Sequence, residues 1–380
     1  QSGAKGYHDQ KTSVLFGCTP EIIKSLIVQT VDFPNAIVLP DTLFRGGILQ
    51  NCTEFPLYYF LFVLGNIAKG KKLTIVGERQ SLESNKVLVG LTVRGPTKEE
   101  YASMGDSPYF KTLYDEARYL SVKDKEGKEI PIEGFIDFIP FAKGEARIEG
   151  GLIRHVDQDL YAVGGTEVSL KEGGSQNPTY DLNIDYAPKT PQKFGVDILG
   201  GGSGFTPGKP SSAVLLNYNS DYMLIDCPPY LDRHLAARGI AREQLKSLFL
   251  THIHDDHCNI FPLVEFNTKM KFLGTSEIYW MTLKKLSLQT MHPMEEFSSY
   301  FEFVQLEPYK ENDFYGIKIV PHYTVHSIPT IGASFYMNEQ GKKHSIGFGG
   351  DNKALPQIDK MVLLGVTTKE KADYPHQLYR

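Results

Sequence analysis

The sequence predicts an α/β protein in which helices pack on sheets. Three observations support this class: apolar strand-like runs alternate with helical stretches, short turns rich in Asn, Asp and Gly join pairs of strands, and helices end near glycines. The pattern is clearest in the second half of the chain. There we expect hairpins of 212–218 with 222–225 and of 334–337 with 345–348, a buried strand at 248–250, and helices at 230–238 and 276–288.

Single residues set the bounds of these elements. Asn219-Ser-Asp221 and Asn338-Glu-Gln-Gly341 supply the turns of the two hairpins. Gly239 follows the first helix, and glycine readily adopts the left-handed conformation that ends a helix. In the first half, Phe55–Leu64 is mostly apolar and is interpreted as a buried helix, because it is too short to span a membrane.

Length and composition exclude several classes of protein. At roughly 150 residues per domain, a chain of 380 residues suggests about two domains. Hydrophobic residues make up 41% and charged residues 22% of the chain, which excludes a long disordered chain and a fibrous repeat. The net charge of -5 excludes a strongly basic nucleic-acid coat.

No feature of the sequence indicates secretion or insertion into a membrane. The chain has no apolar run of the roughly 20 residues that span a bilayer, and it does not open with a signal peptide. Four cysteines are too few for a disulfide scaffold. We therefore expect a reduced, cytoplasmic protein without a membrane partner. The chain starts without Met and stops at Arg380 without an evident terminus, so we expect a piece of a longer polypeptide.

The two halves of the chain resemble each other around their cysteines. Val14–Ile23 and Met223–Asp232 each contain an apolar strand, then Cys, then Pro at the start of a helix, at an offset of 209. Cys52–Phe60 and Cys258–Phe266 share Cys, Phe, Pro, Leu and Phe at an offset of 206. We interpret these matches as an internal duplication. The paired cysteines are expected to be buried packing residues.

The duplication and one polar stretch define the expected domains. Residues 173–191 are rich in Gly, Pro, Asn and Asp, which is typical of a linker. We expect a first domain over residues 1–172, a linker over 173–192 and a second domain over 193–380.

The segment Leu250-Thr-His-Ile-His-Asp-Asp-His257 carries the strongest functional signal. Three histidines and two aspartates fall within six residues, directly after an apolar strand. Imidazole and carboxylate groups suit zinc, manganese or iron. Without a cation, so many titratable groups in one place would repel one another once protonated. If the loop curls, His252 and His254 converge on one ion, while Asp256 and His257 point elsewhere and could hold a second.

This segment resembles the signature of the metallo-β-lactamase superfamily of metallohydrolases, and the resemblance extends over about residues 193–360. Further segments match the family's motifs in order: residues 198–216 resemble the opening hairpin, 225–227 the first motif, 326–332 the third motif of the tRNase Z and phosphodiesterase branch, and 348–351 the fourth. The resemblance implies an αββα sandwich, here duplicated.

The resemblance also implies two divalent metal ions, zinc first, with manganese and iron as alternatives. The implied ligands are His252, His254 and His326 for the first metal, Asp256 and His257 for the second, and Asp351 as a bridge between them. The family's fifth motif should supply one more histidine. After Asp351 the chain has only His376, whose context does not look like the end of a strand, so the ligand is expected either beyond Arg380 or in a weak second site.

We also assign roles to residues that are expected to lie near the metal ligands. Asp226 would orient the ligand loop, and Asp256 could take or relay the proton of the attacking water. Ser327 and Thr330 could contact a substrate phosphate, although shaping the turn at Pro329 is an equal alternative. Asp255, which lies between ligands, is expected to be exposed and to screen the site.

Two further segments are expected to carry no site. Gly200-Gly-Gly-Ser-Gly204 is not a phosphate-binding loop, because Lys209 is followed by proline rather than Ser or Thr; we expect a tight hairpin turn. In the first half, the offset of 206 places Gly46, Ile48, Gln50 and Asn51 at the ligand positions, which is not a ligand set. We expect a degenerate first domain that binds no metal, an arrangement that resembles long-form tRNase Z.

The chemistry implied is metal-assisted hydrolysis. The Ser-Ile-Pro-Thr-Ile-Gly run after His326 favours a phosphodiesterase that acts on a cyclic nucleotide or another small phosphodiester. The acidic net charge favours a small substrate over a long nucleic acid, which stays an open alternative. The oligomeric state is not determined by these features.

Several other functions remain as alternatives. Within hydrolases, they are a tRNase Z-like endoribonuclease and a lactone or thioester hydrolase. From other classes, they are a di-iron redox or sensor protein and a non-catalytic nucleotide-binding scaffold. Di-iron members of the superfamily usually carry Glu where this chain has His254, which disfavours the redox alternative.

Overall fold

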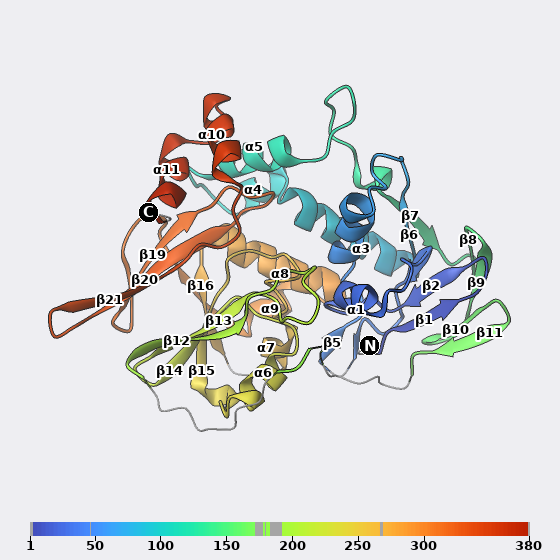
Figure 1. Cartoon of the computed structure of the whole chain (residues 1–380), viewed down its shortest axis with the longest axis horizontal. Helices are drawn as coiled ribbons and strands as arrows, with labels where there is room; N and C mark the ends of the chain where they lie inside the picture. The colour runs from blue at the N-terminus through green and yellow to red at the C-terminus, as the bar shows by residue number, and fades with distance from the viewer. Residues whose placement is uncertain are drawn as a thin grey trace.

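The computed structural model describes residues 3–45, 47–171, 178, 180–182, 192–266 and 269–378, with side chains up to residue 374 in the last range. Within these residues the chain forms two halves, each with two sheets and a set of helices (Figure 1). Most of the expected linker, 173–192, lies outside the described residues.

The first half is built on a mixed five-stranded sheet in the order β1-β2-β3-β6-β7. Its first two strands are antiparallel and the rest run parallel. The strands are β1 (Lys5–His8), β2 (Ser13–Phe16), β3 (Ala36–Val38), β6 (Leu73–Gly77) and β7 (Ile136–Pro140). An antiparallel sheet follows, made of β8 (Glu145–Ile148), β9 (Gly151–Asp157), β10 (Leu160–Val163) and β11 (Thr166–Ser169).

Helices and a short ribbon complete the first half. The helices are α1 (Ile22–Gln29), α2 (Glu54–Tyr58), which continues as a π-helical turn η1 (Tyr59–Val63), α3 (Arg79–Arg94), α4 (Lys98–Ser103), α5 (Phe110–Leu120) and the short η2 (Ile132–Gly134). The ribbon is formed by β4 (Phe44–Arg45) and β5 (Ile48–Leu49).

The side chains of strand β2 alternate between the two faces of the main sheet, and each face packs against a different layer. Successive side chains of a strand point to opposite faces of a sheet. Val14 and Phe16 of β2 pack between the two sheets, against Tyr161 of β10, whereas Leu15 between them packs with Ile23 of α1 on the other face. One face of the main sheet therefore carries helices and the other carries the second sheet.

The second half repeats this arrangement. Its main sheet has the order β12-β13-β14-β15-β16-β17, and the last four strands run parallel. The strands are β12 (Phe194–Gly200), β13 (Ala213–Tyr218), β14 (Asp221–Ile225), β15 (Leu245–Phe249), β16 (Met270–Gly274) and β17 (Phe301–Gln305). The antiparallel sheet consists of β18 (Asn312–Phe314), β19 (Ile317–Tyr323), β20 (Ile331–Glu339) and β21 (Lys342–Phe348).

The helices of the second half lie mainly beside its parallel strands. They are α6 (Leu231–Ala237), the short η3 (Arg242–Gln244), α7 (Phe261–Glu265), α8 (Ser276–Thr290), α9 (Met294–Ser298), α10 (Leu355–Leu363) and α11 (Lys369–Leu378). The α/β class, both hairpins, the buried strand at β15 and the helices α6 and α8 are confirmed. All four cysteines are free and buried, also as expected.

Two expected elements differ in the structure. The helix expected over Phe55–Leu64 forms as α2 and η1, but it is not buried throughout: Phe62 and Val63 are 52% and 57% exposed. The run is apolar on all sides, and the fold covers only one side of it. The expected tight turn at 200–204 is instead a longer connection over residues 201–212, because β12 ends at Gly200 and β13 begins only at Ala213.

The two halves pack closely against each other. Helix α3 of the first half lies beside α8 of the second in the middle of the molecule (Figure 1). At the C-terminal end, Lys371 of α11 forms a buried ion pair with Glu116 of α5. The ligand loops of the second half therefore face helices of the first. Among the described residues, no helix combines the length and apolar character that crossing a bilayer requires.

Candidate metal centre

Three histidine side chains from two loops converge on one point. His252 and His254 lie in the loop after β15, and His326 lies in the loop between β19 and β20. His254 Nδ1 lies 3.0 Å from His252 Nε2 and 3.1 Å from His326 Nε2. Ligands of one tetrahedral zinc ion at about 2.0–2.1 Å are roughly 3.3 Å apart. The three nitrogens therefore fit around a single ion.

A second group of donors adjoins the first. His257, from the same loop, and Asp351, which follows β21, lie close enough to His252 for the three to share an ion. His257 Nε2 is 3.4 Å from Asp351 Oδ1 and 3.7 Å from Asp256 Oδ1. The other Asp256 oxygen accepts the backbone N–H of Gly204 at 2.9 Å. The six predicted ligands are thus brought together at the ends of three strands.

Asp226 links the end of β14 to the ligand loop. Its carboxylate accepts the backbone N–H of Thr251 at 2.8 Å and the Thr251 hydroxyl at 2.8 and 2.9 Å. Asp226 Oδ2 also lies 2.6 Å from Nδ1 of His257. These bonds leave His257 Nε2 facing the second group of donors. Thr251 was missed in the sequence, although it directly precedes the first histidine of the motif.

Burial keeps the first three histidines neutral. Burial and the neighbouring imidazoles hold the pKa values of His252 and His254 well below their usual range, and burial lowers the pKa of His326 to about 4. A neutral imidazole has a free lone pair and is the form that binds metals. For His257, burial lowers the pKa, but the carboxylates of Asp256 and Asp226 outweigh it and raise the pKa well above its usual range. The negative charge of these carboxylates therefore stabilises the protonated form of the buried His257 imidazole.

Buried polar contacts hold the backbone of the ligand loop. The Lys285 ammonium of α8 donates to the Ile253 carbonyl at 2.6 Å and pairs with Asp255 at 2.7 Å. Asn259 donates to the Asp255 carbonyl. The expectation that Asp255 is exposed is wrong: it is 8% exposed, because its carboxylate neutralises a buried lysine. Lys285 was not identified in the sequence, where it resembles any lysine of an amphipathic helix.

The first half closes one side of the site. The Thr92 carbonyl at the end of α3 lies 3.0 Å from His254 Nε2, and the Tyr58 ring of α2 meets the His254 ring edge-on at 6.2 Å. Glu54 of α2 accepts the backbone N–H of Asp255 at 3.2 Å. None of these first-half residues carries a sequence motif that would have marked it.

Three other predicted residues are placed differently. Ser327 is half-buried beside His326, and its contact with a substrate phosphate stays a prediction. Thr330 is fully buried, and its hydroxyl donates to the Ile328 carbonyl at 2.9 Å inside the turn, which favours the turn-shaping alternative. His376 lies in helix α11, and its side chain is outside the described residues.

The two halves can be compared at one loop, where each has an isolated bridge. Isolated bridges pair Cys18 with Asn51 and Cys227 with Cys258, so the offset at this loop is 207 rather than 206. The pairing of backbone positions therefore differs by one residue from the pairing expected from the sequence. In the expected pairing, Gly46 took the place of His252, and Gly46 is outside the described residues. With this register, the positions equivalent to His252, His254, Asp256 and His257 are Arg45, Gly47, Leu49 and Gln50.

One further group of potential ligands lies in the first half. Asp41, Glu78 and His155 bring ligand atoms within 4.8 Å of one another. The two ring nitrogens of His155 face different carboxylates, with Nε2 at 2.9 Å from Asp41 and Nδ1 at 3.1 Å from Glu78. The imidazole therefore already lies between its two acidic partners.

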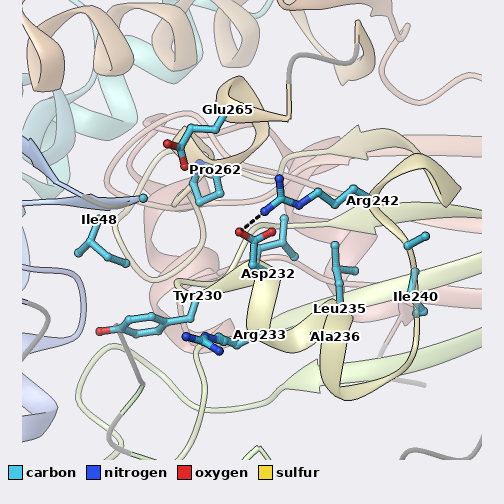
Figure 2. Close-up of a pocket in the computed structure, with 13 residues that line it drawn as sticks. Ile48, Tyr230, Asp232, Arg233, Leu235, Ala236, Ile240, Arg242, Pro262 and Glu265 are labelled. Atoms are coloured by element: carbon cyan, nitrogen blue, oxygen red, sulfur yellow. Dashed lines mark hydrogen bonds and ion pairs between the residues drawn. The ribbon is translucent and has the colours of Figure 1, made fainter. Parts of the chain in front are cut away.

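A cavity of about 460 Å³ lies where the β4–β5 ribbon of the first half meets α6 and α7 of the second. Figure 2 shows Ile48 on one side of it and Tyr230, Asp232 and Leu235 on the other. The corresponding space beside the metal ligands, lined by Ile22, Phe55 and Asp256 among others, measures only about 10 Å³. The space at the junction beside the metal ligands is therefore much smaller than the cavity at the opposite junction.

Comparisons with known proteins found one family model and several curated relatives. Residues 194–363 match the family model described as anti-Pycsar protein Apyc1. The chain is 27% identical over 277 residues to the cGMP-dependent 3',5'-cGMP phosphodiesterase A of Dictyostelium discoideum, a match that covers 67% of this chain and 30% of that protein. It is 26% identical over 153 residues to ribonuclease Z of Azobacteroides pseudotrichonymphae, covering 38% of this chain and 52% of that protein.

A solved structure is also similar. The short form of human tRNase Z is 19% identical, with a TM-score of 0.33, over 41% of this chain and 70% of that one. The chain spans about a third and about half, respectively, of the lengths of the two curated relatives named above. The predicted resemblance is confirmed by sequence: this chain is similar to a cyclic-nucleotide phosphodiesterase and to a ribonuclease Z.

Proposed function

We propose that this chain is a metal-dependent phosphodiesterase that hydrolyses a cyclic nucleotide or another small phosphodiester. The observation that carries the proposal is the convergence of His252, His254 and His326 on one point, with His257 and Asp351 beside them. Asp351 lies between the two groups, with Oδ2 at 3.9 Å from His326 Nε2 and Oδ1 at 3.4 Å from His257 Nε2. These residues would hold two divalent ions, with zinc as the first candidate, and Asp351 would contribute to their binding.

Metal ions in such a site supply positive charge that polarises a phosphate oxygen and makes a water molecule more acidic. The residues of the chain supply orientation and proton transfer. Asp226 holds His257 and the start of the ligand loop through Thr251. The carboxylate of Asp256, fixed by the Gly204 N–H, is the group we assign to receive or relay the proton of the attacking water.

The exposure of the ligands supports an approach of the substrate from the Asp351 side. The Asp351 side chain is 45% exposed and that of His326 is 14% exposed, whereas His252 is fully buried. Ser327, next to His326, is placed to contact a phosphate that enters there. The similarity to a cyclic-nucleotide phosphodiesterase supports a cyclic nucleotide as the substrate to test first.

The test is turnover by metal-loaded protein. Protein reconstituted with zinc or manganese should hydrolyse cAMP, cGMP or the artificial substrate bis-p-nitrophenyl phosphate, and metal analysis should find two ions per chain. His326→Ala should abolish turnover. His292→Ala is the matched control, because His292 is exposed and pairs with Glu296 far from the ligands. Metal-loaded protein that leaves all three substrates intact would contradict the proposal.

Ribonuclease Z activity is the second candidate, supported by the 26% identity to a ribonuclease Z. A precursor tRNA with a 3' extension distinguishes the two. Cleavage of that RNA without turnover of cyclic nucleotides would replace the first proposal by this one.

We also infer that the first half is a degenerate copy of the second. Both halves have a sheet that begins with antiparallel pairing, one pair in the first half and two in the second, and continues with parallel strands, and both have a four-stranded antiparallel sheet after it. Glu21 and Tyr230, at an offset of 209, both adopt positive φ, 58° and 62°, directly before α1 and α6. Because Arg45, Gly47, Leu49 and Gln50 replace the ligands, we expect no ion at that position of the first half.

A further inference from the structure

His254 is the metal-site histidine that faces the first half of the chain. Its Nδ1 lies 3.0 Å and 3.1 Å from the ring nitrogens of His252 and His326, so Nδ1 is the atom that faces the ion position. Its Nε2 points the other way and lies 3.0 Å from the carbonyl oxygen of Thr92. A neutral imidazole has one N–H, and the acceptor beside it decides which nitrogen carries the proton. The Thr92 carbonyl therefore places the proton on Nε2 and leaves Nδ1 free to bind.

The Thr92 carbonyl is available because the helix ends at Gly95 and a proline follows. In an α-helix this carbonyl would accept the N–H of residue 96, four positions on. Residue 96 is proline, which has no N–H. The helix ends at Gly95, whose φ is 66° and whose N–H goes to the Leu91 carbonyl at 2.9 Å. The next carbonyl, that of Thr92, is thus left without a helical donor; it accepts the Tyr58 hydroxyl at 3.4 Å and lies 3.0 Å from His254 Nε2 of the second half.

Glu54 supports the same histidine from a second helix. Its side chain is 3% exposed, and Oε2 accepts the backbone N–H of Asp255, the residue directly after His254, at 3.2 Å. Its other oxygen lies 3.8 Å from His254 Nε2. One buried carboxyl group therefore fixes the backbone after the ligand and also approaches its ring N–H. Carboxyl groups and carbonyls in such positions orient metal-bound histidines and raise their basicity.

We propose that the first half is a working part of the metal centre, in which the Thr92 carbonyl and Glu54 are positioning groups that hold His254 with Nδ1 towards the ion. The inference rests on the proposed metal site of the second half. It gives the first half a direct chemical role in the neighbouring site.

The test measures metal affinity and the state of His254 rather than turnover. Zinc affinity is determined by competition with a chelating dye. Glu54→Ala should weaken zinc binding about 10- to 100-fold, the usual effect of losing such a partner. Glu54→Gln keeps an acceptor oxygen for the Asp255 N–H and should bind zinc within a few-fold of the parent. Pro96→Ala gives the Thr92 carbonyl a competing helical N–H and should also weaken binding, by less than Glu54→Ala.

The matched control is Glu116→Ala. Glu116 is as buried as Glu54, at 2% exposed, and lies in the same half, but it contacts Thr367 and Lys371 rather than the ligand loop. This variant should lose folding stability and keep its zinc affinity. Nitrogen-15 NMR of the histidines provides the second readout: the parent should show His254 metal-bound through Nδ1 with a proton on Nε2, and Glu54→Ala should broaden or shift that signal.

Two results would overturn the inference: unchanged zinc affinity in Glu54→Ala, or an equal loss in Glu116→Ala. A parent that binds no zinc at the three histidines would also overturn it, together with the proposed function. Zinc binding that responds to Glu54 in a protein without phosphodiesterase turnover would support this inference and contradict only the proposed function.

Discussion

At the scale of single residues, the backbone conformation of Asp226 shows a constraint that the site places on the chain. Its φ is 57°, a conformation that residues other than glycine rarely adopt. At the offset of 209 the first half has Gly17, with φ 77°, which has no carboxylate. The second half thus has an aspartate in a backbone conformation that suits glycine. Its carboxylate accepts a hydrogen bond from the Thr251 N–H and lies beside Nδ1 of His257.

Asp226→Asn is expected to weaken the binding of metal at His257. Asparagine keeps one acceptor oxygen for Thr251, but its NH2 group would face the N–H of His257 and could not accept it. We expect zinc affinity to fall about 10- to 100-fold, measured by chelator competition. Asp232→Asn is the control, because that carboxylate forms an exposed ion pair with Arg242 and lies outside the ligand group. Equal zinc affinity in both variants would contradict the role of Asp226.

The cluster of candidate ligands could be predicted from the sequence, but most of the residues that contact it could not. His252 to His257 lie within one short segment, so local spacing was enough to identify them. Glu54 and Lys285 contact the same loop from positions 201 and 32 residues away, and neither stands out among the chain's other charged residues. Their role depends on which helices the fold brings to the loop, and no local pattern contains that information.

At the scale of elements, the connection over residues 201–212 is part of the site rather than a simple turn. Its Gly204 N–H holds Asp256, and the Phe55 ring of α2 lies directly against Gly204. A Cβ atom at this position would come within 2.0 Å of that ring. Composition predicted a turn, because glycine favours turns. It could not show that one of these glycines is needed for close contact with an aromatic ring from the other half.

Gly204→Ala is expected to displace this connection and to loosen Asp256. The methyl group has no room beside Phe55, so the loop or α2 must move, and we expect lower thermal stability and lower turnover. Gly201→Ala is a closely matched control, because a Cβ atom there meets nothing within 4 Å. Differential scanning fluorimetry and phosphodiesterase assays on both variants test the idea. It fails if Gly204→Ala and Gly201→Ala behave alike.

At the scale of the whole molecule, the two halves are joined through buried charge. Lys24 of α1 is fully buried and reaches the other half: its ammonium donates to the Lys209 carbonyl at 2.9 Å and to the Ser211 hydroxyl at 3.0 Å. Glu21, its ion-pair partner at 2.5 Å, accepts the Ser211 hydroxyl at 2.7 Å. The sequence predicted two similar halves from paired Cys-Pro motifs. It did not identify Lys24 and Ser211, which lie outside those motifs, as residues that join the halves.

Lys24→Ala should therefore destabilise both halves together. It leaves the Glu21 carboxylate buried without its cation, which typically costs about 3–5 kcal/mol. Lys72→Ala is the control: Lys72 lies in the same half and pairs with Asp137, but both side chains are exposed, and such pairs contribute about 0–1 kcal/mol. Urea unfolding can be followed by circular dichroism for the whole chain and by the fluorescence of Trp280, the single tryptophan, in α8 of the second half.

If the halves unfold as one unit, Lys24→Ala shifts both signals by the same amount, although the substituted residue lies in the first half. A shift in circular dichroism with an unchanged Trp280 transition would mean that the halves unfold independently. That outcome would also weaken the case for a first half that holds His254 in place, because a metal centre cannot depend on a domain that unfolds without disturbing it. The position of the Trp280 transition in this one variant therefore tests whether the metal site and its supporting half form a single cooperative structure.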